Sequence, residues 1–472
     1  MVRYGTSGSI YRVGRSRERE PFKSARGLPA RMNPGDRVRV DRGVATYEGV
    51  LMPSSTAEHL VVKLEGGYNV GVDRADADVE VLESGTYDVE GARETADDAV
   101  DGAAVGDDVA GDGPEGDGAV GDDAASEITF DDDLPTVALI STGGTIASTV
   151  DYRTGAVTAQ FDAEDVLRAV PALAGRANYR GRVVANILSE NMTPEVWVDL
   201  AEAVHEEIDR GADGVVVMHG TDTMQYTASA LSFMLDTPVP VVFTGSQRSA
   251  DRPSSDNVMN AVCAVEAATA DHSEVLVCMH ATESDDRCAL HRATRVRKNH
   301  TSRRDAFETV GAQPIGEVDW ETGTVSFRRA VADRDAVDLD LSASLEGDVA
   351  FQKFVPGTPV DALDRADGAA GLVLEGTGLG HVHTDWIDRI GELVDDGTVV
   401  VMTSQCLEGR VCDRVYDTGR DLLEAGVVEA GDTLPGTAYV KLMWALANVE
   451  NVEETMRRSI AGELQERSVP WT

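Results

Sequence analysis

Apolar runs alternate with amphipathic stretches in the part of the chain that follows Leu134. Four of these runs have no polar alternation, as is typical of strands covered on both faces of a parallel sheet; they span residues 137–140, 215–218, 241–243 and 275–279. Residues 194–210 and 255–269 carry apolar side chains at helical spacing, and the second stretch starts at a predicted N-cap, Ser254-Ser255-Asp256. The pattern predicts an α/β fold with doubly wound parallel sheets.

A second, smaller α/β unit is predicted further along the chain. Residues 310–345 read as hairpins and a connector, and strands are expected near 371–374 and 399–402. The apolar stretch 438–447 fits a last helix packed in the core. We therefore expect an N-terminal catalytic domain over residues 135–345 and a C-terminal domain over 346–472.

The beginning of the chain has shorter periodic runs. Short β-like segments separated by turns span residues 37–40, 45–51, 60–64 and 68–72. Four or five short strands of this kind predict a small SH3-like β-barrel over residues 32–83, a type of domain that usually serves for docking.

Two segments of biased composition flank this barrel. Residues 94–133 contain 15 acidic and no basic side chains, so residues 84–134 are predicted to be a flexible acidic linker. Residues 1–31 carry eight basic side chains against Glu18 and Glu20. They are either a basic, disordered arm that binds RNA or the product of a start codon assigned too far upstream.

The net charge excludes several classes of function. The chain has 42 basic and 83 acidic side chains, a formal charge of −41, which repels phosphate backbones and is typical of proteins adapted to concentrated salt. No apolar run reaches the roughly 20 residues of a membrane span, and no secretory signal is recognisable, so we expect a cytoplasmic protein. The five cysteines form no CxxC pair, so we expect free thiols and no metal site.

Hydroxyl-rich turns follow three of the predicted strands. They are residues 141–148 (STGGTIAS), 219–224 (HGTDTM) and 244–247 (TGSQ). Because ligands bind beyond the carboxyl ends of the strands in open parallel sheets, these turns are expected to converge on a site. The first turn lacks the Lys and the glycine spacing of a P-loop, and the GTGLG segment 376–380 is too short for a dinucleotide fingerprint, so nucleotide binding has little support.

The residue types in these turns suit acyl transfer. A Thr hydroxyl needs a base to act as a nucleophile, and Lys is a known partner. The chain has only five lysines, and Lys298 follows the strand predicted at 275–279. If Lys298 reaches Thr221, a relay from hydroxyl through ammonium to the carboxylate of Asp222 is complete. Each feature also has a simpler explanation, since Thr and Gly are ordinary turn residues and Lys298 lies among arginines that suit a surface.

Two of these turns resemble the signatures of the L-asparaginase family. TGGTIA at 142–147 and HGTDTM at 219–224 occur in the family's order, each after a buried strand. The resemblance covers about residues 135–472 and implies a two-domain α/β fold and amide hydrolysis through a Thr nucleophile. By motif position, Thr145 matches the nucleophile, Thr221 and Asp222 match the second Thr and the Asp, and Lys298 matches the family's Lys.

The same resemblance implies substrate-binding residues. The segment LSENM at 188–192 is similar to the loop that binds the α-amino and α-carboxylate groups, with Ser189 and Glu190 as contacts. Tyr152 lies where the family's lid carries a Tyr, and backbone N–H groups of the turn at Gly144 would hold the oxyanion. Leu379 departs from the resemblance, because family members that act alone often have an Asn in the turn matching Gly378 to Gly380.

Barrel, linker and catalytic unit together resemble the D-subunit family of archaeal glutamyl-tRNA(Gln) amidotransferases, and segments 33–38, 188–192 and 415–420 have close counterparts there. That resemblance implies a glutaminase that supplies ammonia for converting Glu-tRNA(Gln) to Gln-tRNA(Gln). The partner would be the family's E subunit, in a heterodimer that assembles as a D2E2 tetramer. The E subunit would bind the tRNA and use ATP with Mg²⁺, and no cofactor is expected on this chain.

Two other functions stay open. The chain could be a free-standing asparaginase or glutaminase with no tRNA role, or a non-catalytic component that docks a partner through its barrel. Whether asparagine or glutamine is preferred, and which Thr is acylated first, does not follow from the sequence.

Overall fold

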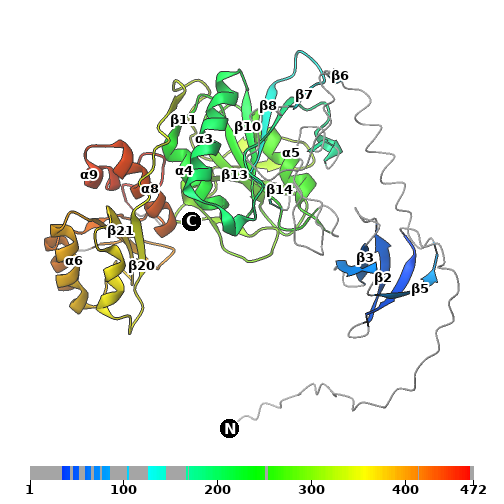
Figure 1. Cartoon of the computed structure of the whole chain (residues 1–472). Coiled ribbons are helices and arrows are strands. Elements are labelled where there is room, and N and C mark those ends of the chain that lie inside the picture. Colours follow the sequence, from blue (N-terminus) through cyan, green and yellow to red (C-terminus); the bar gives the residue numbers. More distant parts are fainter. Residues whose placement is uncertain are drawn as a thin grey trace, which may run out of the picture.

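The computed structural model describes residues 35–42, 46–52, 59–64, 69–74, 77–84, 104–105, 126–144, 166–167, 170–249, 254–412 and 414–467. These residues form a five-stranded sheet, a ten-stranded sheet with helices on its faces and a four-stranded sheet with helices of its own (Figure 1). All helices of this described part are too short or too polar to cross a membrane.

The five-stranded sheet is antiparallel, in the order β4-β3-β2-β1-β5. Its strands are β1 (Arg37–Asp41), β2 (Thr46–Met52), β3 (His59–Leu64), β4 (Asn69–Asp73) and β5 (Asp78–Glu83). Along β1 the side chains alternate between exposed and buried, so that Val38 and Val40 enter a small core with Leu51, Leu60 and Val62. The strand-rich unit that the sequence predicts is therefore present, with a fifth strand beyond the four apolar runs.

The ten-stranded sheet has a parallel centre, with strands in the order β9-β8-β10-β12-β13. These strands are β8 (Thr136–Ser141), β9 (Asn178–Val183), β10 (Gly214–Met218), β12 (Val241–Thr244) and β13 (Val275–His280). The four apolar runs of the sequence form β8, β10, β12 and β13, as predicted. Antiparallel strands extend the sheet on the β13 side: β14 (Arg287–Arg292), β17 (Gly316–Asp319) and β18 (Val325–Phe327).

Helices cover both faces of this sheet, which explains the lack of polar alternation in its strands. Ala138 and Ile140 pack on one face in the same cluster as α3 (Pro194–Asp209) and α4 (Met224–Met234). Val137 and Leu139 pack on the opposite face with α5 (Asn257–Ala268). The doubly wound arrangement expected from the sequence is confirmed.

The other edge of the sheet corrects the predicted extent of the acidic linker. β7 (Ser126–Thr129) pairs with β9, and β6 (Ala104–Val105) pairs with β7. Ile128 is 2% exposed and belongs to the core. Residues 126–134 thus belong to the sheet and the turn that follows β7. Burial of the apolar Ile128 side chain stabilises this part of the acidic segment.

The smaller sheet is fully parallel, in the order β20-β21-β22-β23. Its strands are β20 (Val349–Lys353), β21 (Gly371–Gly376), β22 (Val399–Ser404) and β23 (Val428–Glu429). Its helices are α6 (Ile387–Asp395), α7 (Asp417–Glu424), α8 (Pro435–Asn448) and α9 (Val452–Met456). The stretch expected to be the last helix is α8, and the short α9 follows it.

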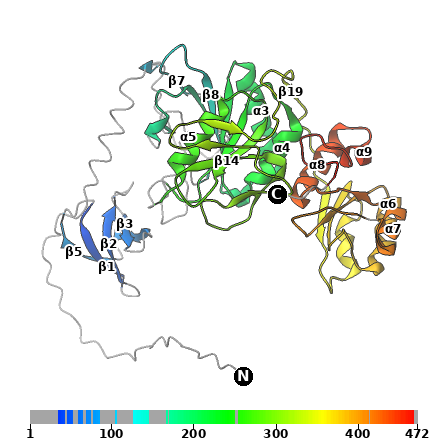
Figure 2. The same ribbon diagram turned by 180° about the vertical axis from the view of Figure 1, so that it is seen from behind.

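The two α/β units share one hydrophobic cluster. α8 packs against α4, side by side in both views (Figures 1 and 2), and Val373 and Val401 of the smaller sheet belong to the same cluster as α4. Two small antiparallel pairs lie outside the large sheets: β11 (Leu235–Asp236) with β19 (Asp340–Leu341), and β15 (Val296–Lys298) with β16 (Phe307–Thr309). Short 3₁₀ turns complete the described elements: η3 (Pro171–Leu173), η4 (Ser189–Asn191), η5 (Ala293–Arg295), η6 (Val360–Ala366) and η7 (Thr384–Trp386).

Candidate functional site

The three hydroxyl-rich turns meet at the carboxyl ends of β8, β10 and β12. Thr142 N donates to Met218 O at 3.0 Å, and His219 N donates to Thr244 O at 2.9 Å, so the parallel ladder continues into the turns. A Cβ built on Gly245 would lie 3.0 Å from Thr221 Cγ2, which shows how closely the second and third turns approach. The expected convergence is therefore present in the fold.

The first turn approaches the second one backbone to backbone. Gly144 has φ +94°, and a Cβ built there would lie 2.7 Å from both Cα and N of Gly220. A side chain at residue 144 would combine a strained backbone with a clash. Thr145 follows by one peptide bond and, like Tyr152, lies outside the described residues.

Lys298 joins the hydroxyl and the carboxylate of the second turn. Its Nζ donates to Thr221 Oγ1 at 2.8 Å and to Asp222 Oδ1 at 2.6 Å. The Lys298 side chain is 10% exposed, and that of Asp222 is 66% exposed. Lys298 is therefore not the surface residue that its arginine neighbours suggested, and the three predicted side chains form one hydrogen-bonded cluster.

Gln225 is a residue of this site that the sequence did not single out. Its Oε1 accepts a hydrogen bond of 2.8 Å from the backbone N of Lys298. Gln225 lies in the first turn of α4, directly after the HGTDTM motif, so one segment contacts both ends of Lys298. Its position next to the motif was the only available signal.

Ser189 is held against the second turn. Its Oγ accepts from Thr223 N at 3.0 Å and lies 2.9 Å from Thr223 Oγ1, whose own proton is donated to Ser189 O. Ser189 is 8% exposed, whereas Glu190 is exposed. Ser189 thus lies against the turn that carries Thr221 and Asp222, and Glu190 follows it directly in the chain.

His219 is a neutral structural residue. Burial lowers the pKa of its imidazole from 6.5 to about 4. Nδ1 lies 2.6 Å from Gly220 O, which only accepts, so Nδ1 carries the proton and Nε2 accepts from the Thr227 hydroxyl at 2.8 Å. His219 therefore fixes the backbone of Gly220, the residue that Gly144 contacts.

Asp256 holds the third turn. The predicted N-cap residue does begin α5, but its carboxylate reaches back to the turn, accepting from Ser246 Oγ, Gln247 N and Arg248 N, each at 2.9 Å. Asn260 Nδ2 donates to the same carboxylate at 3.0 Å. Asp256 is fully buried, and these four donors engage both oxygens of its carboxyl group.

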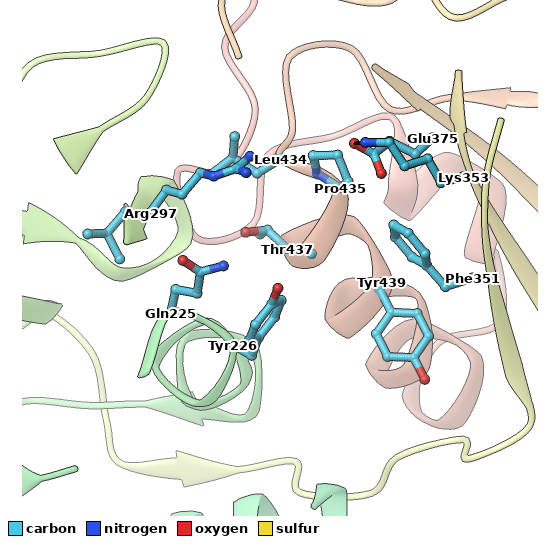
Figure 3. Close-up of a pocket in the computed structure, with 12 residues that line it drawn as sticks. Gln225, Tyr226, Arg297, Phe351, Lys353, Glu375, Leu434, Pro435, Thr437 and Tyr439 are labelled. Atoms are coloured by element: carbon cyan, nitrogen blue, oxygen red, sulfur yellow. Dashed lines mark hydrogen bonds and ion pairs between the residues drawn. The ribbon is translucent and has the colours of Figure 1, made fainter. Parts of the chain in front are cut away.

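A cavity of about 370 Å³ lies between the two α/β units, beside the strand that carries Lys298. Figure 3 shows Gln225, Tyr226 and Arg297 on one side of it and Phe351, Lys353 and Glu375 on the other. Thr221, Asp222 and Lys298 do not line it, so it is separate from the hydrogen-bonded cluster. Nor does the described part of the chain contain three His, Cys, Asp or Glu side chains grouped to hold a metal ion.

Family models match three parts of the chain. "GatD N-terminal domain" matches residues 32–82, "Asparaginase, N-terminal" matches 136–332 and "Glutaminase/Asparaginase C-terminal domain" matches 348–458. Among solved structures, the thermostable L-asparaginase from Thermococcus kodakarensis is 33% identical with a TM-score of 0.63, over 70% of this chain and 99% of that one. A probable cytoplasmic L-asparaginase from Campylobacter jejuni is 29% identical with a TM-score of 0.58, over 69% of this chain and 100% of that one.

Curated relatives match nearly the whole chain. The D subunit of the glutamyl-tRNA(Gln) amidotransferase from Haloquadratum walsbyi is 69% identical over 442 residues, covering 93% of this chain and 99% of the relative. The protein of the same name from Methanosarcina mazei is 49% identical over 437 residues, covering 92% and 98%. Both the predicted family and the predicted fold class are confirmed: the chain belongs to the asparaginase family and, within it, to the group of glutamyl-tRNA(Gln) amidotransferase D subunits.

Proposed function

We propose that the chain is the glutamine-hydrolysing component of a tRNA-dependent amidotransferase. The observation that carries the proposal is the cluster in which Lys298 Nζ bonds both Thr221 Oγ1 and Asp222 Oδ1, beside the turn of Gly144. Family membership supplies the expected substrate, a carboxamide. The close relatives are named for glutamyl-tRNA(Gln), which favours glutamine as the ammonia donor.

The proposed reaction has two steps. Thr145 Oγ attacks the side-chain carbonyl carbon of glutamine while its proton passes toward the Thr221–Lys298 pair, and Asp222 keeps Lys298 in place. Backbone N–H groups of the turn at Gly144 stabilise the oxyanion. The proton is then delivered to the leaving nitrogen, ammonia departs, and water hydrolyses the acyl ester to release glutamate and free Thr145.

Substrate binding is assigned to residues around the same turns. Ser189 and Glu190 lie next to the second turn and would contact the α-amino and α-carboxylate groups of glutamine. Tyr152 would close over the substrate from the segment that follows Thr145. Glu190 is exposed, and Asp222 is largely exposed although its Oδ1 is bound to Lys298, so the negative charge on this side of the site favours an ammonium group.

The ammonia is proposed to serve a second protein. That partner, the E subunit in the family, would bind Glu-tRNA(Gln), activate its glutamate with ATP and Mg²⁺ and form Gln-tRNA(Gln), in a D2E2 assembly in the cytoplasm. The charge of −41 supports this division of labour, because the chain by itself repels nucleic acid.

Glutamine hydrolysis by variants of the purified chain in concentrated salt tests the chemistry. Lys298→Met and Thr221→Val are expected to lower kcat by about 10²- to 10⁴-fold, the usual contribution of acid–base groups. Thr221→Ser, which keeps a hydroxyl, should retain part of the rate. Lys353→Met is the matched control, because Lys353 pairs with Glu375 at 2.9 Å, is 51% exposed and lies outside the cluster. Full activity of Lys298→Met would refute the assignment.

A second assay separates the amidotransferase from its alternatives. Glutamine hydrolysis is measured with and without the E subunit and Glu-tRNA(Gln). Strong stimulation by both supports the proposal, whereas equal rates indicate a free-standing amidohydrolase. If Thr145→Ala leaves the glutamine-dependent formation of Gln-tRNA(Gln) intact, the chain is a non-catalytic docking component.

A further inference from the structure

Lys298 lies on a strand that the large sheet does not hold. β15 pairs only with β16, in a two-stranded sheet of its own, among the described strands. At the Lys298 end the backbone is held by Gln225. The cavity beside Arg297 separates this end from the smaller α/β unit (Figure 3). The other end of the strand, at Arg295, is anchored by a separate set of contacts.

Arg295 provides that anchor at the base of the strand. It is 3% exposed, and its guanidinium donates to Gly462 O at 3.1 Å, to Val310 O at 3.3 Å and to Asp432 Oδ2 at 2.8 Å. The Asp432 side chain is 6% exposed. The guanidinium of Arg295 thus joins the β15–β16 pair to the smaller α/β unit and to Gly462. Both side chains of the ion pair are buried, so water hardly competes for these hydrogen bonds.

The end of the chain completes the anchor; we call residues 460–465 the C-terminal brace. Thr294 Oγ1 donates to Ala461 O at 2.9 Å, directly before Arg295. Gln465 N donates to Asp432 Oδ1 at 2.9 Å, so both oxygens of Asp432 are engaged. The turn before β15 therefore contacts residues more than 130 positions later in the sequence, both in the brace and at Asp432.

A second buried ion pair holds the same brace without touching β15. Lys441 Nζ lies 2.6 Å from Glu463 Oε1, and both side chains are fully buried. Glu463 also accepts from the backbone N of Ile460 and Ala461. This pair ties the brace to α8, so the brace is held both at Asp432 and at Lys441.

We propose that Arg295, through its ion pair with Asp432, is a positioning residue that sets the distance from Lys298 to Thr221 and Asp222. The inference rests on the proposed function, because Lys298 matters only if its cluster carries the chemistry. Arg295 ends the turn η5, directly before β15, and Lys298 lies three positions further along the chain, a span of about 10 Å in extended backbone. A shift at the base is therefore transmitted to Nζ, and misplacement of about 1 Å lowers rates by about 10²-fold.

The test compares the Arg295–Asp432 pair with a buried ion pair outside the brace, in glutamine hydrolysis. Arg295→Met and the milder Asp432→Asn are expected to lower kcat by about 10- to 100-fold with KM changed by less than about three-fold, and to shift the pH profile of kcat. The control Glu207→Gln removes a buried carboxylate of α3 that lies 3.0 Å from Arg180 of β9, outside the brace, and it is expected to lower the thermal midpoint while kcat and its pH profile stay unchanged. Should Arg295→Met fail to fold, Asp432→Asn carries the comparison, since it keeps the side-chain volume.

Two outcomes overturn the positioning role. The first is a kcat near wild type in a folded Asp432→Asn variant. The second is a loss of kcat in the control that is as large as in the Arg295 and Asp432 variants, when the thermal midpoints of all of them are similar. Lys298→Met in the same assay separates failure of the positioning role from failure of the proposed function. If Lys298→Met is active, the catalytic assignment fails; if it is inactive while Asp432→Asn behaves as wild type, only the positioning role of Arg295 fails.

Discussion

Replacing Gly144 by Ala tests whether the close approach of the first two turns is required for function. Gly144 has φ +94°, a backbone conformation that costs a residue with a side chain about 1–2 kcal/mol. The new Cβ would lie 2.7 Å from Gly220 Cα, whereas ordinary contact begins at 3.4 Å, so the two turns must separate by 3.4 − 2.7 = 0.7 Å. Overpacking of this kind adds about 1–3 kcal/mol.

The same displacement predicts a loss of activity. Gly220 is followed directly by Thr221, so moving the second turn by 0.7 Å moves the hydroxyl that Lys298 contacts. Misplacement of about 1 Å commonly costs about 10²-fold in rate, and we expect kcat for glutamine hydrolysis to fall about 10- to 100-fold. Unfolding by denaturant and steady-state kinetics on the same sample measure both effects.

Gly211→Ala is the matched control for this prediction. Gly211 has φ +88°, close to that of Gly144, but a Cβ built there meets nothing within 4 Å. The Gly211→Ala variant should therefore lose only about 1–2 kcal/mol of folding stability, the cost of its backbone conformation, and keep its kcat. A Gly144→Ala variant with kcat within about two-fold of wild type, or an equal loss of kcat in both variants, would refute the reasoning.

Three further predictions concern buried polar groups. Lys441→Met should destabilise the fold by about 3–5 kcal/mol because it leaves Glu463 buried without a cation, and the double variant with Glu463→Gln should recover part of this in a denaturation cycle. Asp256→Asn should lower both stability and kcat, because an amide cannot accept from all four donors of the third turn; unchanged kinetics would contradict this. Burial lowers the pKa of His291 to about 4, below the unfolded value of 6.5, so the unfolded chain takes up the proton first. His291 is thus expected to lower the free energy of unfolding by about 3 kcal/mol as the pH falls from 6.5 to 4. In the His291→Gln variant the free energy of unfolding should depend less steeply on pH in that interval.

The central strands were predictable because their environment is simple. A strand covered on both faces is mostly apolar, and β8, β10, β12 and β13 are recognisable from apolar runs of three to five residues each. Parallel strands bring the residues after their ends to one edge, so the meeting of the turns at Gly144 and Thr221 followed from the same pattern. Motif resemblance then selected Lys298 among the basic residues near it.

What the sequence did not reveal depends on contacts between distant segments. Arg295 lies in a segment rich in arginines, which is typical of an exposed surface. It contacts Asp432 and Gly462, which are more than 130 positions away in the sequence, and the sequence pattern does not indicate these contacts. Gln225 has an ordinary helical environment, and its bond to the backbone of Lys298 is a tertiary contact. The order of residues 126–134 was hidden by the acidic residues on both sides of the buried Ile128.

Covalent labelling tests the central claim most directly, because it reports which hydroxyl attacks the carboxamide. The chain is incubated with a glutamine analogue that carries an electrophilic carbon in place of the side-chain carboxamide, and the modified peptide is located by mass spectrometry. We expect one label, on Thr145, formed at a rate that Lys298→Met lowers in proportion to kcat and that excess glutamine suppresses. Stoichiometric inactivation with the label on another residue, and Thr145 unmodified, would contradict it.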